Sequence, residues 1–310
     1  MTTRLVAALA LVVPLALPLA AGAQLRVAGN TSTLELAPVL LAAQELGADR
    51  AVVRNGGIPA LFEADAADLA TNAETQALRQ SVDHPDLRVI LTVAEGFYRV
   101  VARRSSGVRT LADLRGKRIA TAPSTSSAYY LFKTLATAGL APADVTIVPL
   151  SPLSRMPPAL AAHEIDALTI WEPEIQRAAD LAGADAIEFQ DRRVYRELFG
   201  LYATVATLAN PAKRGEVVAF VRALLRASER IRGRPSDAWP LVAASTGYDA
   251  ALIEKVWHHE GYPGTLASDL LDVMVDEDVY LAPERNRGPR ARAELAKLID
   301  DSVLREALRD

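Results

Sequence analysis

The chain has 310 residues, of which 50% are hydrophobic, 23% charged and 5% aromatic. This length and composition are typical of a globular protein with one large domain or two medium ones. The net charge of −4 argues against a nucleic-acid-binding protein, because such proteins carry a basic face. Cysteine is absent, which excludes disulfides, thiolate catalysis, thiolate metal sites and a lipid-anchoring cysteine.

The first 23 residues have the pattern of a secretory signal peptide. Arg4 gives a positive start, an apolar run from 5 to 20 follows, and Ala21-Gly22-Ala23 is a small-x-small cleavage pattern. The alternative is a membrane anchor, but the run is short for the roughly 20 residues that span a bilayer, and two prolines interrupt it. We therefore predict export with cleavage after Ala23, which for a protein without disulfides fits a bacterial periplasm.

Apolar periodicity predicts alternating strands and helices over the first third of the mature chain. Strands are expected at 25–28, 51–54, 68–71, 87–93 and 97–102, and helices at 34–46, 59–65 and 72–81. This order is typical of a doubly wound α/β domain.

A second α/β unit is expected from about 105 to 203. Its expected strands are 118–122, 144–150, 165–170 and 186–189, and its expected helices are 111–116, 128–139, 155–163 and 174–182. A strand-like run follows at 202–209, and everything from Pro211 onward is expected to be helical. The sequence therefore predicts two α/β lobes with a helical tail.

Four hydroxyl residues, Ser124 to Ser127, lie between a predicted strand and a predicted helix that ends at Gly139, a left-handed C-cap position. The first turn of a helix has unpaired N–H groups and a partial positive charge, so it can hold an anion without a basic side chain. Ser126 and Ser127 would add hydroxyl donors to those amides. The alternative is that one serine only caps the helix.

Ligands in open α/β sheets bind beyond the carboxyl ends of the strands. Five loops follow a predicted strand in this way, at 30–33, 71–75, 96–98, 124–127 and 171–172. The candidate ligand-binding residues in them are Asn30, Ser32, Thr33, Thr71, Asn72, Glu74, Tyr98, Ser124, Ser126, Ser127, Trp171 and Glu172.

Several of these residues have a structural alternative. Trp171 can stack on a ligand or fill the core between the lobes. Glu172 can accept a ligand amine or hold a hinge through backbone N–H groups, and Glu74 can serve only the helix dipole. Arg99 and Arg155 are candidate cationic partners for an anion, although solvated arginine is the commoner fate.

Motifs for catalysis are absent from the sequence. None of the four histidines stands at metal-ligand spacing in a strand-end loop, and there is no Gly-x-Ser-x-Gly elbow or Walker-type phosphate loop. We therefore predict a protein that is not an enzyme and holds no metal or cofactor.

Segments along nearly the whole mature chain resemble the solute-binding components of ABC importers for nitrate, sulfonates and taurine, a superfamily that includes binders of pyrimidine precursors. They are LADLRGKRIA at 111–120, the serine turn with its Ala-Gly-Leu exit at 124–140, Ile-Asp-Ala at 165–167 before Trp-Glu-Pro at 171–173, and Leu-Ile-Asp at 298–300. The serine turn and the Trp-acid-Pro exit together point to the sulfonate/taurine-like branch.

This resemblance implies a type II periplasmic-binding fold, with two lobes joined by two crossover strands and a ligand in the cleft between them. Lobe I is then expected at 24–104 and 205–310, and lobe II at 105–204. The crossings are expected near 100–104 and 202–207. In such proteins the lobe II helix N-terminus commonly holds an anionic group, which matches Ser124 to Ser127.

The function implied is that of the periplasmic substrate-binding component of an ABC importer. It would act as a monomer, capture a small polar organic anion or zwitterion, and present it to an inner-membrane permease with its ATPase. Two alternatives stay open: the same role for a pyrimidine-like heterocycle, or an exported enzyme with Glu74 or Glu172 as general base. The pyrimidine-synthase enzymes of this fold are associated with a cysteine cluster, which this chain lacks.

Overall fold

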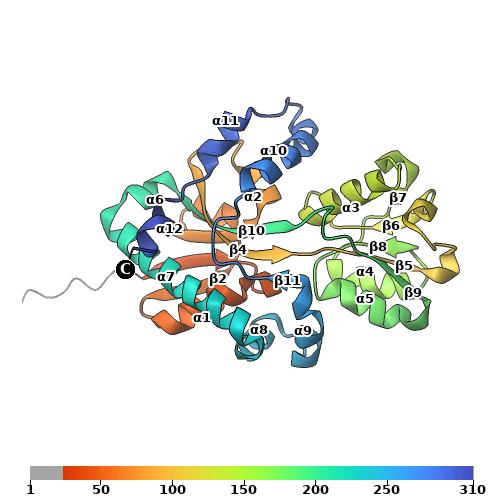
Figure 1. Cartoon of the computed structure of the whole chain (residues 1–310), viewed down its shortest axis with the longest axis horizontal. Coiled ribbons are helices and arrows are strands. Elements are labelled where there is room, and N and C mark those ends of the chain that lie inside the picture. The colour runs from red at the N-terminus through yellow and green to blue at the C-terminus, as the bar shows by residue number, and fades with distance from the viewer. Residues whose placement is uncertain (1–23, 310) are drawn as a thin grey trace, which may run out of the picture.

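The computed structural model describes residues 24–309, which form two β-sheets covered by helices (Figure 1). The predicted signal peptide lies outside the described residues. We call the part built on the first sheet lobe I and the part built on the second sheet lobe II. The predicted two-lobed α/β fold is confirmed.

The sheet of lobe I has six strands in the order β11-β4-β10-β3-β1-β2. In chain order these are β1 (Leu25–Gly29), β2 (Ala51–Asn55), β3 (Leu69–Ala73), β4 (Leu87–Gly96), β10 (Glu197–Thr204) and β11 (Glu260–Gly261). Strand β1 runs parallel to β2 and β3, whereas β10 runs antiparallel to both β3 and β4.

The sheet of lobe II has five shorter strands in the order β7-β6-β8-β5-β9. They are β5 (Val100–Arg103), β6 (Arg118–Ala120), β7 (Thr146–Ile147), β8 (Ala167–Leu168) and β9 (Ala186–Phe189). Strand β6 runs parallel to β7 and β8, and β5 is antiparallel to β8 and β9. Both sheets are therefore mixed, which differs from a purely parallel doubly wound sheet.

The antiparallel strands β5 and β10 are the ones that enter a sheet from the other lobe. Strand β4 ends in the first sheet at Gly96 and β5 begins in the second at Val100, so the chain crosses at 97–99. It returns between Phe189 and Glu197. A strand that arrives from the other lobe starts at the junction between the lobes and runs away from it. The neighbouring strands that end at the junction run toward it, so the pairing is antiparallel.

These crossings correct the positions expected from the sequence. The return was expected near 202–207, but the whole of β10 already pairs with β3 and β4. The first crossing was expected near 100–104, but Val100 to Arg103 already pair in the second sheet as β5. Residues 97–99, expected as strand, are the first crossing itself. The run at 202–209 divides into the end of β10 and helix α6 (Val205–Ala209). A continuous apolar run in the sequence does not indicate at which residue the chain passes from one sheet to the other.

Helices cover both faces of each sheet. In lobe I these are α1 (Ala37–Leu46), α2 (Glu74–Gln80), α6 and the C-terminal helices α7 (Pro211–Gly233), α8 (Trp239–Thr246), α9 (Ala250–Val256), α10 (Leu270–Leu281), α11 (Arg292–Leu295) and α12 (Ser302–Ala307). Lobe II has α3 (Ser126–Thr137), α4 (Met156–Ala161) and α5 (Glu174–Ala182). The tail is thus helical as predicted, except for the edge strand β11.

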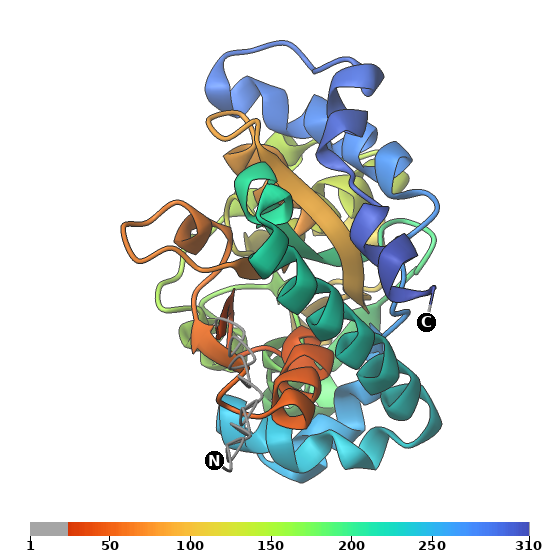
Figure 2. The same ribbon diagram turned by 90° about the vertical axis from the view of Figure 1, so that its left-hand side faces the viewer.

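Strand β1 shows how the lobe I sheet feeds two cores. Leu25 and Val27 belong to the core under α1 and α7, whereas Ala28 belongs to the core under α2 and α10. Side chains along a strand alternate between faces, so a strand covered on both faces reads as a continuous apolar run. Helix α7 packs against α1 and α12 along the outer face of this lobe (Figure 2).

The long helix α7 starts at a well-defined cap. The Asn210 side chain accepts hydrogen bonds from the backbone N–H groups of Ala212 and Lys213, and Pro211 occupies the first helical position. Its buried face includes Phe220, which is fully buried in the lobe I core.

We expect Phe220→Ala to lower the free energy of unfolding by about 3–5 kcal/mol, because it removes a buried ring and leaves a cavity in the lobe I core. Leu308→Ala is the matched control: Leu308 is 66% exposed, so its change is expected to stay within about 0.5 kcal/mol. Urea denaturation of both variants measures the two effects, and equal losses would contradict the assigned core.

Candidate functional site

A cavity of about 360 Å³ lies where the two lobes meet. Lobe I and the crossing segments contribute Asn30, Thr33, Glu35, Asn72, Ala73, Gln76, Tyr98, Glu197 and Phe199, and lobe II contributes Pro123, Ser124, Thr125, Ser126 and Trp171. Its walls therefore come from the segments after β1, β3, β6 and β8, from the first crossing and from the start of β10. The carboxyl ends of strands in the two sheets meet here, as the strand-end rule requires.

The lobe II wall is the N-terminus of α3. Thr125 is its cap residue, with extended backbone and a side-chain oxygen that accepts the Ser127 N–H at 3.2 Å. A threonine rather than a serine thus fills the capping role. Ser124 has φ of +62°, in the left-handed region that side chains rarely adopt. The C-terminal end follows the prediction, since Gly139 has φ of +68°.

Two polar contacts join the lobes at this wall. The Ser126 hydroxyl lies 3.1 Å from the Thr75 hydroxyl of α2, and the Gln76 side-chain amide donates to the Ser124 carbonyl at 2.7 Å. The first turn of α2 and the first turn of α3 are therefore held against each other beside the cavity.

The cavity brings together residues from all five loops that the sequence singled out. The predicted site residues that line it are Asn30, Thr33, Asn72, Tyr98, Ser124, Ser126 and Trp171. Ser126 and Trp171 in particular face the same space from one lobe. That these residues contact a ligand stays a prediction.

Three of the other predicted site residues lie outside the cavity lining. The Ser127 hydroxyl donates to the Thr169 carbonyl at 2.7 Å and lies 2.8 Å from the Thr121 hydroxyl, so it is committed inside lobe II. Ser32 is exposed, and its backbone N–H donates to the Asn30 side chain. Thr71 is buried beside Gly29, and its hydroxyl has no partner among the described residues.

Glu74 is also outside the cavity lining and has a structural role. Its carboxylate accepts the Tyr195 hydroxyl at 2.6 Å and the Leu198 N–H at 2.9 Å. It therefore ties the start of α2 to the returning crossing, whereas the sequence suggested a ligand contact or, alternatively, a helix-dipole role. Burial raises the pKa of Glu74 above its ordinary value.

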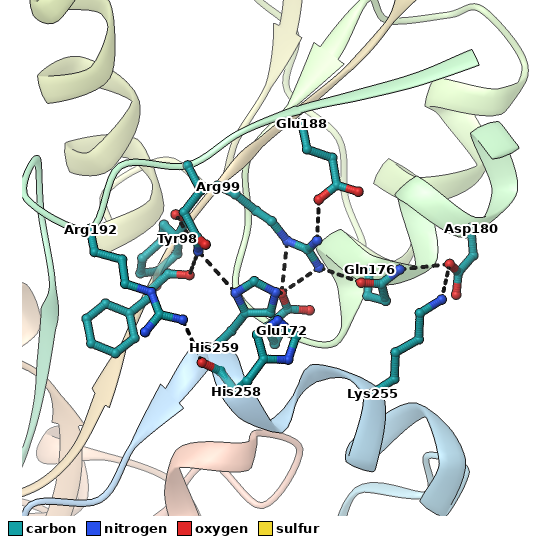
Figure 3. Close-up of polar contacts among 12 residues, drawn as sticks. Tyr98, Arg99, Glu172, Gln176, Asp180, Glu188, Arg192, Lys255, His258 and His259 are labelled. Carbon is teal, nitrogen blue, oxygen red and sulfur yellow. Dashed lines mark hydrogen bonds and ion pairs between the residues drawn. The ribbon is translucent and has the colours of Figure 1, made fainter. Parts of the chain in front are cut away.

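Glu172 belongs to a buried network at the hinge, drawn in Figure 3. Its Oε1 accepts hydrogen bonds from Arg99 at 2.7 and 3.1 Å, and His259 Nε2 lies 3.8 Å from the same oxygen. Arg99 also donates to Gln176 at 2.8 Å and pairs with Glu188. Arg99 of the first crossing is thus bonded to three side chains of lobe II, and His259 of the C-terminal part lies beside one of them, Glu172.

The returning crossing joins the same network through Gln190. Its side-chain amide donates to the Phe97 carbonyl at 2.9 Å and lies 3.1 Å from His259 Nδ1. Burial and the charge of Arg99 lower the pKa of His259 to about 3, so this imidazole is neutral at neutral pH. Of the two arginines suggested for an anion, Arg99 is committed to the hinge and Arg155 is exposed.

Two buried carboxyl groups of the cavity wall, Glu35 and Glu197, were missed by the sequence analysis. Glu35 lies between Leu34 and Leu36 just beyond the first loop, where an acid in a helical start reads as a solvent-facing residue. Glu197 lies at the amino end of β10, which the rule of strand carboxyl ends does not cover. The Tyr98 hydroxyl donates to Glu197, and burial raises the pKa of both carboxyl groups.

Two further kinds of site are absent from residues 24–309. No helix there is long and apolar enough to cross a membrane. No cluster of three or more histidine, cysteine, aspartate or glutamate side chains in that range is arranged to hold a metal ion.

The model of the NMT1/THI5-like family matches residues 51–238. The chain belongs to the NMT1/THI5-like family. None of the curated proteins matches it in sequence. The match covers parts of both lobes, including the whole of lobe II and the returning crossing of this NMT1/THI5-like protein.

Solved structures show that the family member has a periplasmic-binding-protein fold. The alkanesulfonate-binding protein SsuA of Xanthomonas axonopodis pv. citri, bound to MOPS, is 22% identical with a TM-score of 0.68, covering 90% of this chain and 98% of that one. The periplasmic aliphatic sulphonate binding protein SsuA of Escherichia coli is 19% identical with a TM-score of 0.71, covering 90% and 92%. The desulfurization enzyme DSZB is 17% identical with a TM-score of 0.61, covering 92% and 99%.

Ser127→Ala is expected to lower the free energy of unfolding by about 1–3 kcal/mol, because the buried Thr169 carbonyl loses its hydroxyl donor. Ser32→Ala, on the exposed loop after β1, is the control and should change it by less than about 0.5 kcal/mol. Urea denaturation measures both. A Ser127→Ala protein as stable as the wild type would mean that this hydroxyl is not committed inside lobe II.

Glu172→Gln is expected to change how stability depends on pH. Burial raises the pKa of Glu172 from 4.5 to about 7, although Arg99 lowers it. The folded protein therefore holds this proton more tightly than the unfolded chain, and its contribution to stability is lost as pH rises. As the pH rises from about 4.5 to 8, the free energy of unfolding of the wild type should fall by up to about 3 kcal/mol relative to that of the variant.

Urea denaturation of the wild type and Glu172→Gln across this pH range measures that difference. A difference independent of pH would show that Arg99 keeps the Glu172 carboxylate charged throughout.

Proposed function

We propose that this protein is the periplasmic substrate-binding component of an ABC importer, which captures a small polar organic anion or zwitterion of the sulfonate or taurine type between its two lobes. The observation that carries the proposal is the cavity built from both lobes, with the N-terminus of α3 as one wall. A ligand there touches both lobes at once, so its binding energy depends on how the lobes are placed. This is the physical basis of ligand-driven closure.

The α3 wall supports an anionic end of the ligand. The N-terminal amides of this helix carry the positive end of its dipole, and Ser124 and Ser126 add hydroxyl groups at the cavity. Asn30, Asn72 and Gln76 add amide groups from the opposite lobe. The two SsuA structures belong to proteins described as sulfonate-binding, which fits a sulfonate at this wall.

Delivery to a membrane transporter follows from the same proposal. The liganded protein, a monomer exported to the periplasm, presents its closed form to an inner-membrane permease coupled to an ATPase. Trp171 in the wall also suits a flat ring, so a pyrimidine-like heterocycle is the second ligand class for the same role.

Catalysis with Glu74 or Glu172 as general base finds no support in the geometry. Glu74 is bonded to Tyr195 and Leu198, and Glu172 to Arg99. Neither lines the cavity. A general base must reach the proton that it removes, so the binding role is the better supported one.

A ligand that binds only the folded protein raises the free energy of unfolding, by about 2.7 kcal/mol at a ligand concentration of about a hundred times Kd, and the melting temperature rises with it. We therefore expect at least one compound among sulfonates, taurine, nitrate, pyrimidines and carboxylates to raise the melting temperature by several degrees. A thermal-shift screen of the mature chain measures this. If no compound shifts the melting temperature, the importer assignment fails.

A further inference from the structure

Two acids of the cavity wall have no cationic partner. Glu35 and Glu197 are each only 3% exposed, and neither forms an ion pair with any described residue. The Oε2 atom of Glu35 has no hydrogen-bond partner in the described part of the chain. Buried carboxyl groups are normally paired, so Glu35 Oε2 is an acceptor without a donor in the described part of the chain. Glu197 accepts the neutral hydroxyl of Tyr98 but has no cationic partner there.

A third acid lies behind them across Gly96. Gly96 of β4 pairs with Glu197 of β10 on one side and with Glu260 of β11 on the other. A Cβ on Gly96 would lie 3.8 Å from Glu197 Oε2 and 3.9 Å from Glu260 Oε2. The missing side chain therefore leaves room for two carboxyl groups on one face, and Glu260 Oε2 also has no partner among the described residues.

None of the described residues that line the cavity is basic. Arg99, which follows Tyr98 directly, is turned to the hinge and donates to Glu172, Gln176 and Glu188 (Figure 3). Arg196, which precedes Glu197, is paired with Glu95 and Asp269. The arginines adjacent to Tyr98 and Glu197 in the chain are thus used elsewhere, and the carboxyl groups of Glu35 and Glu197 are left without a cationic partner among the described residues.

Aromatic rings complete this part of the wall. Tyr98, Trp171 and Phe199 line the same cavity as the two acids. The face of an aromatic ring attracts a cation, and the attraction grows where water is excluded. Unpaired carboxyl groups and aromatic faces in one cavity both favour a positively charged organic group.

We propose that the cavity recognises its ligand through a positively charged nitrogen group, which binds between the carboxyl groups of Glu35 and Glu197 against the aromatic wall. This inference rests on the proposed function and deepens it. The ligand class is an organic cation or a zwitterion, whose nitrogen end faces Glu35 and Glu197 and whose polar or anionic end faces Ser124 at the N-terminus of α3. A sulfonate without a nitrogen cation leaves the two acids unpaired and binds weakly.

Taurine and isethionate test this class, because they share the sulfonate and differ only in ammonium against hydroxyl. Isothermal titration of the wild type is expected to give at least about tenfold tighter binding of taurine. Ethylammonium, which carries the positively charged nitrogen without a sulfonate, is expected to raise the melting temperature on its own.

Glu35→Gln and Glu197→Gln keep the shape of the wall and remove its charge. Both are expected to weaken binding of the best nitrogen compound at least about tenfold and to change isethionate binding by less than about threefold. Glu277→Gln is the matched control, because Glu277 is fully buried in α10 but does not line the cavity. It should leave the affinity unchanged, and a cooperative melt of each variant verifies its fold.

The outcomes separate this inference from the proposed function. If isethionate binds as tightly as taurine and both cavity variants bind like the wild type, recognition uses the anion alone, and the inference is wrong while the importer role stands. If neither the nitrogen compounds nor isethionate shift the melting temperature, the inference is wrong, and the proposed function fails with it only when the whole thermal-shift screen is also negative.

Discussion

The buried carboxyl groups of Glu35 and Glu197, which have no cationic partner among the described residues, are the constraint on which this account depends. Burying a charge without a partner costs several kcal/mol, and burial accordingly raises the pKa of both groups. The apolar cores on both sheets offset that cost in the free protein. The site is therefore incomplete without a positively charged ligand. A ligand that pairs with the two carboxyl groups offsets the cost of burying them, and this gain in free energy favours the closed arrangement of the lobes.

The first crossing explains why the cavity contains carboxyl groups while the neighbouring arginine lies outside it. Tyr98 and Arg99 are consecutive residues of the first crossing, yet Tyr98 lines the cavity and Arg99 lies in the hinge network. Tyr98 orients Glu197 by donating its hydroxyl, while Arg99 neutralises Glu172 and Glu188. The same short segment therefore keeps the cavity acidic and links the lobes, so a change at the hinge also acts on the binding site.

Much of the fold could be predicted from the sequence because it depends on local patterns. Helix α5 and strand β9 have the expected bounds, and the serine turn opens a helix as its hydroxyl and apolar spacing indicates. The loops after parallel strands were found by their positions, and seven predicted residues line the cavity. What failed was the route between lobes, because the apolar run that forms β10 looks the same in either sheet.

The acidic part of the site was missed for the same reason. Glu197 reaches the cavity only because β10 enters lobe I from the junction, so that its amino end lies where other strands end. Glu35 required knowledge that its neighbours Leu34 and Leu36 are both buried, which leaves no solvent for the acid between them. Conversely, Ser127 and Glu74 have residue types suited to a ligand but are used by the protein itself.

A crystal structure with the compound that most raises the melting temperature tests the central claim most directly. The account predicts electron density between the lobes, with a nitrogen group within hydrogen-bond distance of Glu35 and Glu197 and the other end at the N-terminus of α3. Density in the groove near Glu45, Arg226 and Arg230, or in the cavity with an anionic group facing the two acids, would contradict it.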